Sequence, residues 1–260
     1  MKKIKTLLMA ALAIVTISSC SKNKSDITPP PAPEVTKKMM TTTFNGNISF
    51  HYSADGKLKQ YISEKLWGTY RYELSYEPGK VTIDIYNTVT NQKAEIHVLT
   101  LNAKGHISST AGTLFNSNGS PYKFTVENFL YDDSGKLIEI NSPGSFTRKY
   151  FYDANGNNNK LEYYDKQNQL EDISYYTFSA LPDKFPGHGM MSYDFYSLFL
   201  PARSKYLVSN LKGVDVTTNS TSFDENITYE LDAQGYVLKG IVDETTPGSI
   251  DWNWSNTWDK

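Results

Sequence analysis

The sequence predicts an all-β fold, a many-stranded antiparallel meander that curls into a barrel-like or half-barrel sheet. Three observations carry this prediction. The 260 residues include 19 Tyr, 12 Phe and 4 Trp, and aromatic side chains favour strands. Apolar and polar residues alternate with period two along many segments after Thr41, as they do in half-buried strands. A turn of one form also recurs along the chain.

The alternation is clearest in the segment that begins at Val81. Val81, Ile83 and Ile85 would share one face of a strand, and the residues between them would share the other. The same pattern occurs in residues 160–163 and 227–232. Strands of this kind bury one face and leave the other in water, which is typical of antiparallel sheets.

The recurring turn places one apolar residue four positions before a Gly or Asn and another two positions after it. A three-residue loop that ends in a residue with positive φ, followed by a bulge, explains this spacing. We expect the two apolar residues to face each other across the hairpin, and Asp132 to support its turn through its side chain. The copies are Tyr52–Leu58, Leu101–Ile107, Tyr131–Leu137, Tyr164–Leu170 and Leu231–Val237, the fourth with Asn168 in place of Gly.

The turns also set the size of the sheet. Gly56, Gly79 and Gly105 mark two-strand units of roughly 20 to 26 residues, a repeat length typical of stacked units that bury each other's faces. We expect about ten to fourteen strands, and a flat sheet of that size is unusual because twist accumulates. The sheet should therefore curl.

One segment, residues 181–200, breaks the pattern. It contains prolines and glycines and then a compact apolar run in which Tyr193, Tyr196 and Leu200 have helical spacing. We expect a long excursion with a short helix. Long loops in compact domains are often functional, but a helix that only covers an open edge of the sheet is the favoured interpretation.

The N-terminus has the features of a lipoprotein signal peptide over residues 1–19. Lys2, Lys3 and Lys5 precede an apolar stretch that is too short to span a bilayer. The run that ends at Cys20 resembles a lipobox, in which the cysteine thiol becomes lipidated. Cys20 is also the only cysteine of the chain. We predict a lipid anchor on Cys20, with an ordinary signal peptide and a chance cysteine as the alternative.

Residues 20–40 are predicted to tether the lipid to a single hairpin domain over residues 41–260. The tether is polar and has four prolines between Pro29 and Pro33, a composition that forms extended, semi-rigid linkers. No acidic stretch follows Cys20 to direct export to the cell surface. We therefore favour the periplasmic face of the outer membrane.

The hairpins resemble YD-type repeats at Tyr131-Asp132 and Tyr152-Asp153. The chain as a whole resembles an uncharacterised lipoprotein family of Gram-negative bacteria, a domain of unknown function with a porin-like fold. The lipobox, the serial hairpins and the segments 201–206 and 229–241 carry this resemblance. It implies a curled, many-stranded antiparallel sheet and supplies no activity. We do not expect a membrane channel, because the apolar faces are shorter and more interrupted than those of outer-membrane strands.

Composition and motifs argue against several functions. The formal net charge is only −2, which argues against nucleic-acid binding through bulk charge. One cysteine excludes an internal disulfide and a multi-cysteine zinc site. The four histidines, which we expect on the surface or rim, form no metal-binding motif; they are His51, His97, His106 and His188. We predict no metal, no cofactor and no catalytic residue.

The strongest candidates for ligand binding lie at the C-terminus. Trp252 and Trp254 would share one face of a final strand, with Trp258 nearby, and exposed indoles stack on sugar rings. Anchoring of the last strand in the core is the favoured alternative. His188, between two glycines, is a further candidate, although no nucleophile motif accompanies it.

The sequence therefore favours a non-enzymatic cell-envelope lipoprotein that binds or scaffolds an unknown ligand. Its partners would be the membrane, through Cys20, and a glycan or an envelope protein. The alternative is a glycan-binding lipoprotein that uses exposed Trp and Tyr side chains. An enzyme has the least support, because no catalytic constellation emerges from the residues.

Overall fold

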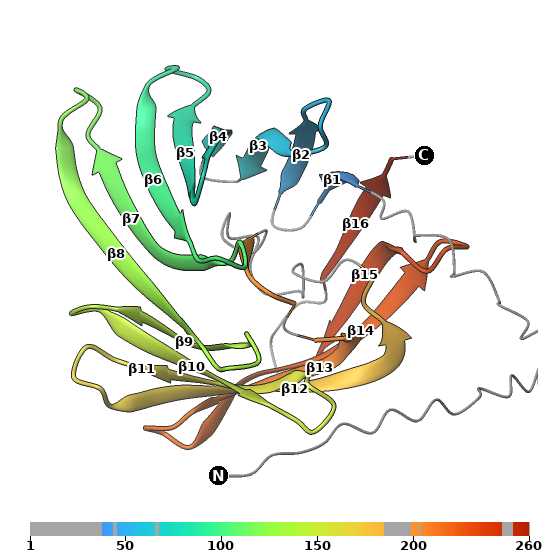
Figure 1. The fold of residues 1–260 in the computed structure, drawn as a ribbon. Coiled ribbons are helices and arrows are strands. Elements are labelled where there is room, and N and C mark those ends of the chain that lie inside the picture. Colours follow the sequence, from blue (N-terminus) through green and yellow to red (C-terminus); the bar gives the residue numbers. More distant parts are fainter. Residues whose placement is uncertain are drawn as a thin grey trace, which may run out of the picture. The chain divides into compact units, whose positions relative to one another are not determined.

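The protein is an antiparallel β-barrel in a computed structural model that describes residues 38–43, 46–65, 68–184, 199–202, 204–245 and 252–259. Each strand pairs with its neighbours in sequence, and the first strand pairs with the last, so that the sheet closes (Figure 1). The strands are β1 (Met39–Thr42), β2 (Asn47–Tyr52), β3 (Leu58–Lys65), β4 (Gly68–Glu77), β5 (Lys80–Asn87), β6 (Lys93–Leu101), β7 (Ile107–Phe115), β8 (Pro121–Tyr131), β9 (Leu137–Ser142), β10 (Phe146–Tyr152), β11 (Asn158–Tyr164), β12 (Leu170–Pro182), β13 (Tyr206–Asp215), β14 (Ser220–Leu231), β15 (Val237–Glu244) and β16 (Trp252–Trp258).

The expected fold class is confirmed, and the sheet closes fully. The expected count of ten to fourteen strands is too low, because the structure has sixteen. One turn outside the recurring form, at Gly144 (φ 73°), separates β9 from β10. Leu181 and Pro182 extend β12. Of the residues with helical spacing, Tyr193 and Tyr196 lie outside the described residues, and Leu200 packs half-buried against buried core residues. In the described part of the chain, no helix is long and apolar enough to cross a membrane.

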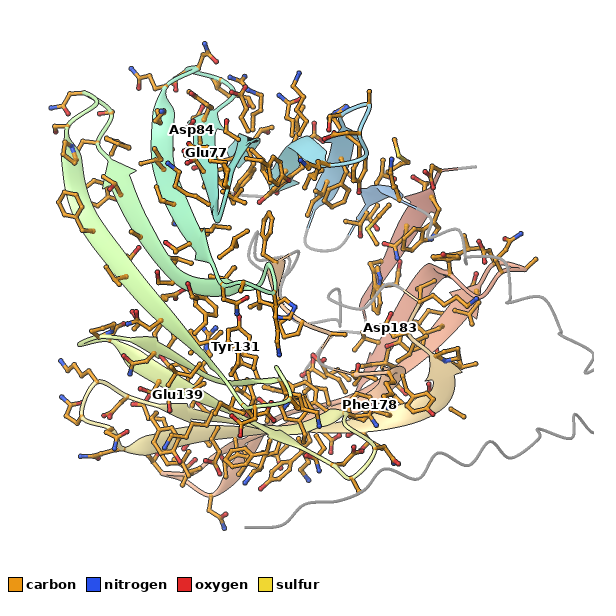
Figure 2. The ribbon with its side chains drawn as sticks, viewed as in Figure 1. Glu77, Asp84, Tyr131, Glu139, Phe178 and Asp183 are labelled. Atoms are coloured by element: carbon orange, nitrogen blue, oxygen red, sulfur yellow. The ribbon has the colours of Figure 1, made fainter. Side chains whose placement is uncertain are left out.

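The alternating residues place one apolar face inside the barrel. On β5, Val81, Ile83 and Ile85 are buried while the residues between them are half-buried. They belong to a cluster of inward side chains from β1 to β11, and a second cluster around Leu211 and Trp254 covers β12 to β16. In Figure 2, the labelled Tyr131 and Phe178 pack against these two clusters, whereas Asp84 lies on the outer face.

The recurring turns have the predicted geometry. All five pairs of flanking apolar residues are cross-strand partners, and each is preceded by a register shift. The loop-closing residues have positive φ, for example 90° at Gly135 and 61° at Asn168. The Asp132 carboxylate accepts a hydrogen bond from the Lys136 backbone N–H at 2.9 Å. Local turn chemistry therefore fixes the register of these hairpins.

The meander brings alternate turns to the same end of the barrel. We call this the Gly-turn end; it holds the turns at Gly56, Gly79, Gly105, Gly135, Gly156 and Gly235. The end of β12 and the start of β13 also lie there, as do the start of β1 and the end of β16. The Lys38 backbone N–H donates to an Asp259 carboxylate oxygen at 2.7 Å, so the two ends of the domain meet at this end.

Candidate functional site

A row of tyrosines links successive hairpins at the Gly-turn end. Each tyrosine precedes a turn and donates its hydroxyl hydrogen to a backbone carbonyl of the preceding hairpin. These bonds join Tyr52 to Met39 (3.0 Å), Tyr76 to Leu58 (2.7 Å), Tyr152 to Leu137 (2.9 Å) and Tyr131 to Ile107. The Trp258 indole N–H makes the equivalent bond to the Val237 carbonyl at 2.9 Å. The repeated tyrosines therefore tie neighbouring strands together at this end, and we call these tyrosines and the adjoining turns the rim.

Lysines cover several of these rings. The distances from the ammonium nitrogen to the ring centroid are 5.4 Å for Lys38 over Tyr52, 5.5 Å for Lys57 over Tyr76, 4.9 Å for Lys136 over Tyr152 and 5.9 Å for Lys184 over Tyr236. A cation over an aromatic face is attracted by the ring quadrupole. The rim therefore presents ammonium groups beside tyrosine rings, and that of Lys57 also lies 3.4 Å from an Asp55 carboxylate oxygen.

The rim should make the barrel sensitive to alkaline pH. Partial burial raises the pKa of Tyr52 and of Tyr76 from 10.0 to about 12, with smaller contributions from Asp259 and Asp55 respectively. A tyrosine whose pKa is higher in the folded state stabilises the fold fully below pH 10 and loses this contribution as the pH rises to 12. We expect the urea midpoint to fall over this range, and to fall less in a Tyr52→Phe, Tyr76→Phe variant.

The control for this titration is Tyr122→Phe, since Tyr122 lies exposed on β8 away from the rim. Urea midpoints between neutral pH and pH 12 measure the effect, and absorbance of the ionised phenol follows the titration. A fall in midpoint that is equal in all three proteins would show that the rim tyrosines do not cause the alkaline instability.

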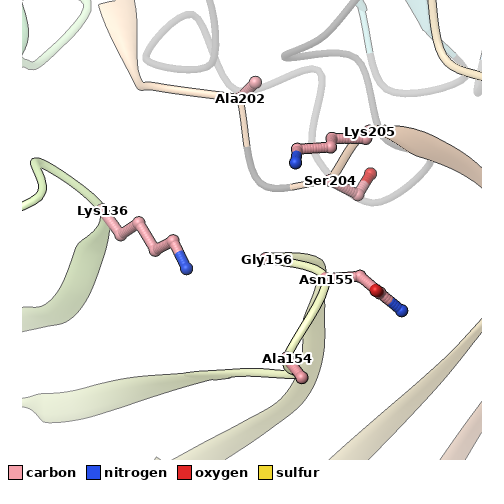
Figure 3. Close-up of a pocket in the computed structure, with 7 residues that line it drawn as sticks. All are labelled: Lys136, Ala154, Asn155, Gly156, Ala202, Ser204 and Lys205. Atoms are coloured by element: carbon pink, nitrogen blue, oxygen red, sulfur yellow. The ribbon is translucent and has the colours of Figure 1, made fainter.

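A cavity of about 400 Å³ opens beside this rim, and we call it the Lys cavity (Figure 3). It lies between the turns that follow β8 and β10 and the segment that enters β13. In Figure 3 the side chains of Lys136 and Lys205 extend toward the space between these elements. The lining residues are Lys136, Ala154, Asn155, Gly156, Ala202, Ser204 and Lys205.

A buried asparagine holds two walls of the Lys cavity together. Asn157 is only 2% exposed, and its amide nitrogen donates to the Asp153 carboxylate at 3.1 Å. Its amide oxygen accepts the Lys205 backbone N–H at 3.0 Å. Because both polar ends of a buried amide are satisfied, this link is strongly specified. The segment at Lys205 is thereby fixed against the turn at Gly156.

The described residues that line the Lys cavity carry positive charge and no negative charge. Within the described ranges, neither ammonium group of Lys136 or Lys205 forms an ion pair, and none of the described residues that line the cavity is acidic. The Asp132 carboxylate of the neighbouring turn accepts bonds from the Ser134 hydroxyl at 2.7 Å and from the Lys136 backbone. These bonds lower the pKa of Asp132, the one from Ser134 most of all. The Asp132 carboxylate therefore makes its hydrogen bonds within its own turn.

Two of the predicted C-terminal site residues, Trp254 and Trp258, are buried or half-buried. Trp254 is 4% exposed and packs edge-on against Tyr229 at 6.1 Å between ring centroids. Trp258 is half-buried and its N–H is bonded. The favoured alternative, core anchoring of the last strand, therefore describes these two residues. Trp252 pairs with Val242 in β16, and its side chain, like all of Cys20 and His188, lies outside the described residues.

His97 corrects the expectation that the histidines lie on the surface or rim. It is 6% exposed and faces the barrel interior on β6, opposite Gly112 on β7. Its Nε2 lies 2.8 Å from a Glu95 carboxylate oxygen. A Cβ at Gly112 would lie 2.9 Å from the His97 Nδ1, so the glycine makes room for the ring. His51 is exposed, as expected.

The Lys cavity was not predicted, because its residues come from three separated stretches of the chain that carry no common motif. The only local signal was the segment 201–206, which contributes Ala202, Ser204 and Lys205. Among the described residues, no group of three or more His, Cys, Asp or Glu side chains is placed to hold a metal ion.

Comparison with known proteins finds similarity in the fold. No family model matches the chain, and no curated protein matches it. A solved porin-like protein from Bacteroides uniformis is similar over 86% of this chain and 96% of its own, with a TM-score of 0.58 and 16% identity. A solved porin-like protein from Bacteroides vulgatus is similar over 85% of this chain and 98% of its own, with a TM-score of 0.47 and 14% identity. At these identities the similarity shows the porin-like fold alone; the lipoprotein family and the YD-type repeats stay predictions.

Proposed function

We propose that this chain is a non-enzymatic cell-envelope lipoprotein whose barrel faces water and acts as a binding or scaffolding module. The observation that carries the proposal is the polarity of the barrel wall. Outer-membrane barrels are apolar outside and polar inside. Here the clustered apolar side chains point inward, so the wall is suited to water on its outside.

Charged side chains occur in the middle of strands on the outer face. Lys160 and Glu162, both within β11, form an ion pair at 2.8 Å. Asp84, within β5, forms another at 2.7 Å with Lys93, the first residue of β6. A Lys or Arg on a lipid-facing strand costs about 2–4 kcal/mol at the bilayer midplane. Exposed ion pairs contribute only about 0–1 kcal/mol in water, so they would not offset this cost. The outer face therefore favours an aqueous surrounding.

The packed apolar interior also favours a barrel whose outer face lies in water. Val81, Ile83 and Leu99 are at most 1% exposed, so the part of the wall that they form is packed and has no contact with water. Side chains that line an aqueous pore are polar. Burial of this apolar face is the main source of stability for a water-soluble barrel, at roughly 25 cal/mol per Å².

Exposed apolar side chains are most numerous on β8, where Tyr122, Phe124, Val126 and Leu130 alternate with inward residues. Others lie on further strands, for example Ile138 on β9, Phe151 on β10, Tyr175 on β12, and Leu238 and Ile241 on β15. A lipid-spanning barrel needs a continuous apolar band around its whole circumference. The outer-face ion pairs on β5, β6 and β11 interrupt such a band, so these residues do not alter the proposal.

Attachment to the membrane is proposed to occur through lipid on Cys20, with the periplasmic face of the outer membrane favoured. Several acyl chains, each CH₂ contributing about 0.8 kcal/mol, would anchor a barrel that does not itself enter the bilayer. The porin-like fold of the similar structures supports an association with the outer membrane. Burial of Trp254 gives no support to a glycan site built on exposed indoles.

Two measurements on the full chain test the proposal. Metabolic labelling with a fatty-acid analogue should label the wild type and not a Cys20→Ala variant. The purified chain should then produce no conductance steps in planar bilayers, under conditions where a general porin added as a control does. Stable, reproducible channels would contradict the water-facing barrel, and labelling that survives Cys20→Ala would contradict the anchor.

A further inference from the structure

We infer that the Lys cavity binds a small anionic sugar, meaning a sugar ring that carries a carboxylate or a phosphate group. This inference rests on the proposed function and deepens it by naming a class of ligand. The observation behind it is the convergence of Lys136 and Lys205, from distant parts of the chain, on one polar cavity (Figure 3).

The first argument is charge. Lys136 and Lys205 have no carboxylate partner in the described part of the chain, as set out above. The acids of the two adjoining turns, Asp132 and Asp153, accept hydrogen bonds from their own turns. Two ammonium groups that share a concave site raise the local concentration of anions. The cavity therefore favours a negatively charged ligand.

The second argument is preorganisation. The Lys136 ammonium rests 4.9 Å from the centroid of the Tyr152 ring, and the Tyr152 hydroxyl is itself bonded to the Leu137 carbonyl. The backbone of Lys205 is held by buried Asn157 at 3.0 Å. Cations that are already positioned lose less freedom on binding, and this improves affinity. Both walls of the cavity are thus fixed before a ligand arrives.

The third argument is size and lining. A volume of about 400 Å³ lies at the small end of ligand pockets, which run from about 300 to 1,000 Å³. Among the described residues that line it, the apolar side chains are those of Ala154 and Ala202, whereas Ser204 and Asn155 supply polar groups. Such a lining suits a hydroxyl-rich ligand of monosaccharide size and gives little affinity for an apolar one. A lysine is a compact point charge that accepts either a carboxylate or a phosphate.

Calorimetric titration of the full chain, purified in mild detergent, tests the inference with three probes: glucuronate, glucose 6-phosphate and neutral glucose. We expect glucose to bind at least about tenfold more weakly than the better anionic sugar, because one hydrogen bond to a charged group changes affinity by about that factor. Whichever anionic sugar binds more tightly identifies the carboxylate or the phosphate as the preferred group. Added salt should weaken its binding.

Substitutions of Lys136 and Lys205 test whether the anionic sugar binds in the Lys cavity. Lys136→Gln and Lys205→Gln should each weaken binding of the preferred anionic sugar by about tenfold, and Lys136→Arg, which keeps the charge, should retain most of it. The matched control is Lys166→Gln, since Lys166 is an exposed turn lysine at the opposite end of the barrel. Melting temperatures equal to that of the wild type show that the variants are folded.

Three results would overturn the inference: no binding of either anionic sugar, equal binding of neutral glucose, or wild-type affinity in both Gln variants. None of them bears on the lipid anchor or on bilayer conductance. Failure of the sugar site is therefore distinguishable from failure of the proposed function.

Discussion

Replacing Ile83 by Asp should lower the free energy of unfolding by more than about 4 kcal/mol, or prevent folding altogether, because an unpaired carboxylate would be buried. Ile83 is 0% exposed and lies within the larger inward cluster. Its cross-strand partner on β6 is His97, but that imidazole already contacts Glu95, so a second acid beside it would add repulsion.

Thr82→Asp is the matched control, because Thr82 is the next residue of the same strand and lies on the outer face. In water, a polar substitution at such a position should change stability by no more than about 0.5 kcal/mol. In a lipid-facing barrel the order of the two variants would be reversed. Equilibrium denaturation followed by tryptophan fluorescence measures both. A larger loss for Thr82→Asp would refute the water-facing barrel.

Gly240→Ala should cost about 1–3 kcal/mol, since it adds volume to a packed core. The backbone of Gly240 does not have positive φ, so any loss arises from contact. A Cβ built there would lie 2.0 Å from Cη2 and 2.1 Å from Cζ2 of Trp254, the partner across the β15–β16 pair. The indole would have to leave the position in which it packs edge-on against Tyr229.

A double-mutant cycle separates this steric effect from a backbone effect. In a Trp254→Ala background the added methyl group meets no ring, so Gly240→Ala should cost much less there. The expected coupling energy is in the range of about 0.5–3 kcal/mol for residues in contact. Additive losses in the denaturation midpoints would show that the glycine is required for its backbone and not for the indole.

The hairpins show how far local patterns reach. The spacing around Gly135 predicted both the pairing of Tyr131 with Leu137 and the bulge beside it, and the register confirms both. Such predictions succeed because turn geometry and the two-residue period are set within a few residues of chain. The same patterns did not predict how the Tyr131 hydroxyl is used: it reaches the Ile107 carbonyl of the preceding hairpin, a contact between units rather than within one.

The Trp and His residues show where local patterns fail. Period two placed Trp252 and Trp254 on one face of a strand but did not say whether that face looks inward. That choice depends on the neighbouring strand, where Gly240 leaves space for the Trp254 ring. The burial of His97 depends in the same way on Gly112 across the β6–β7 pair. Orientation thus follows from a partner that lies on another strand.

The sequence by itself determined that the domain is a meander of half-buried antiparallel strands, with turns of known register, because these features depend on neighbours along the chain. Only the tertiary structure decided that β1 pairs with β16, that sixteen strands close the barrel and that the apolar face lies inside it. It also assembled the Lys cavity from residues 136, 154–156, 202, 204 and 205. Closure and the cavity depend on the strand number, the twist and the side-chain packing of the whole sheet. These properties cannot be read from any single segment of the sequence.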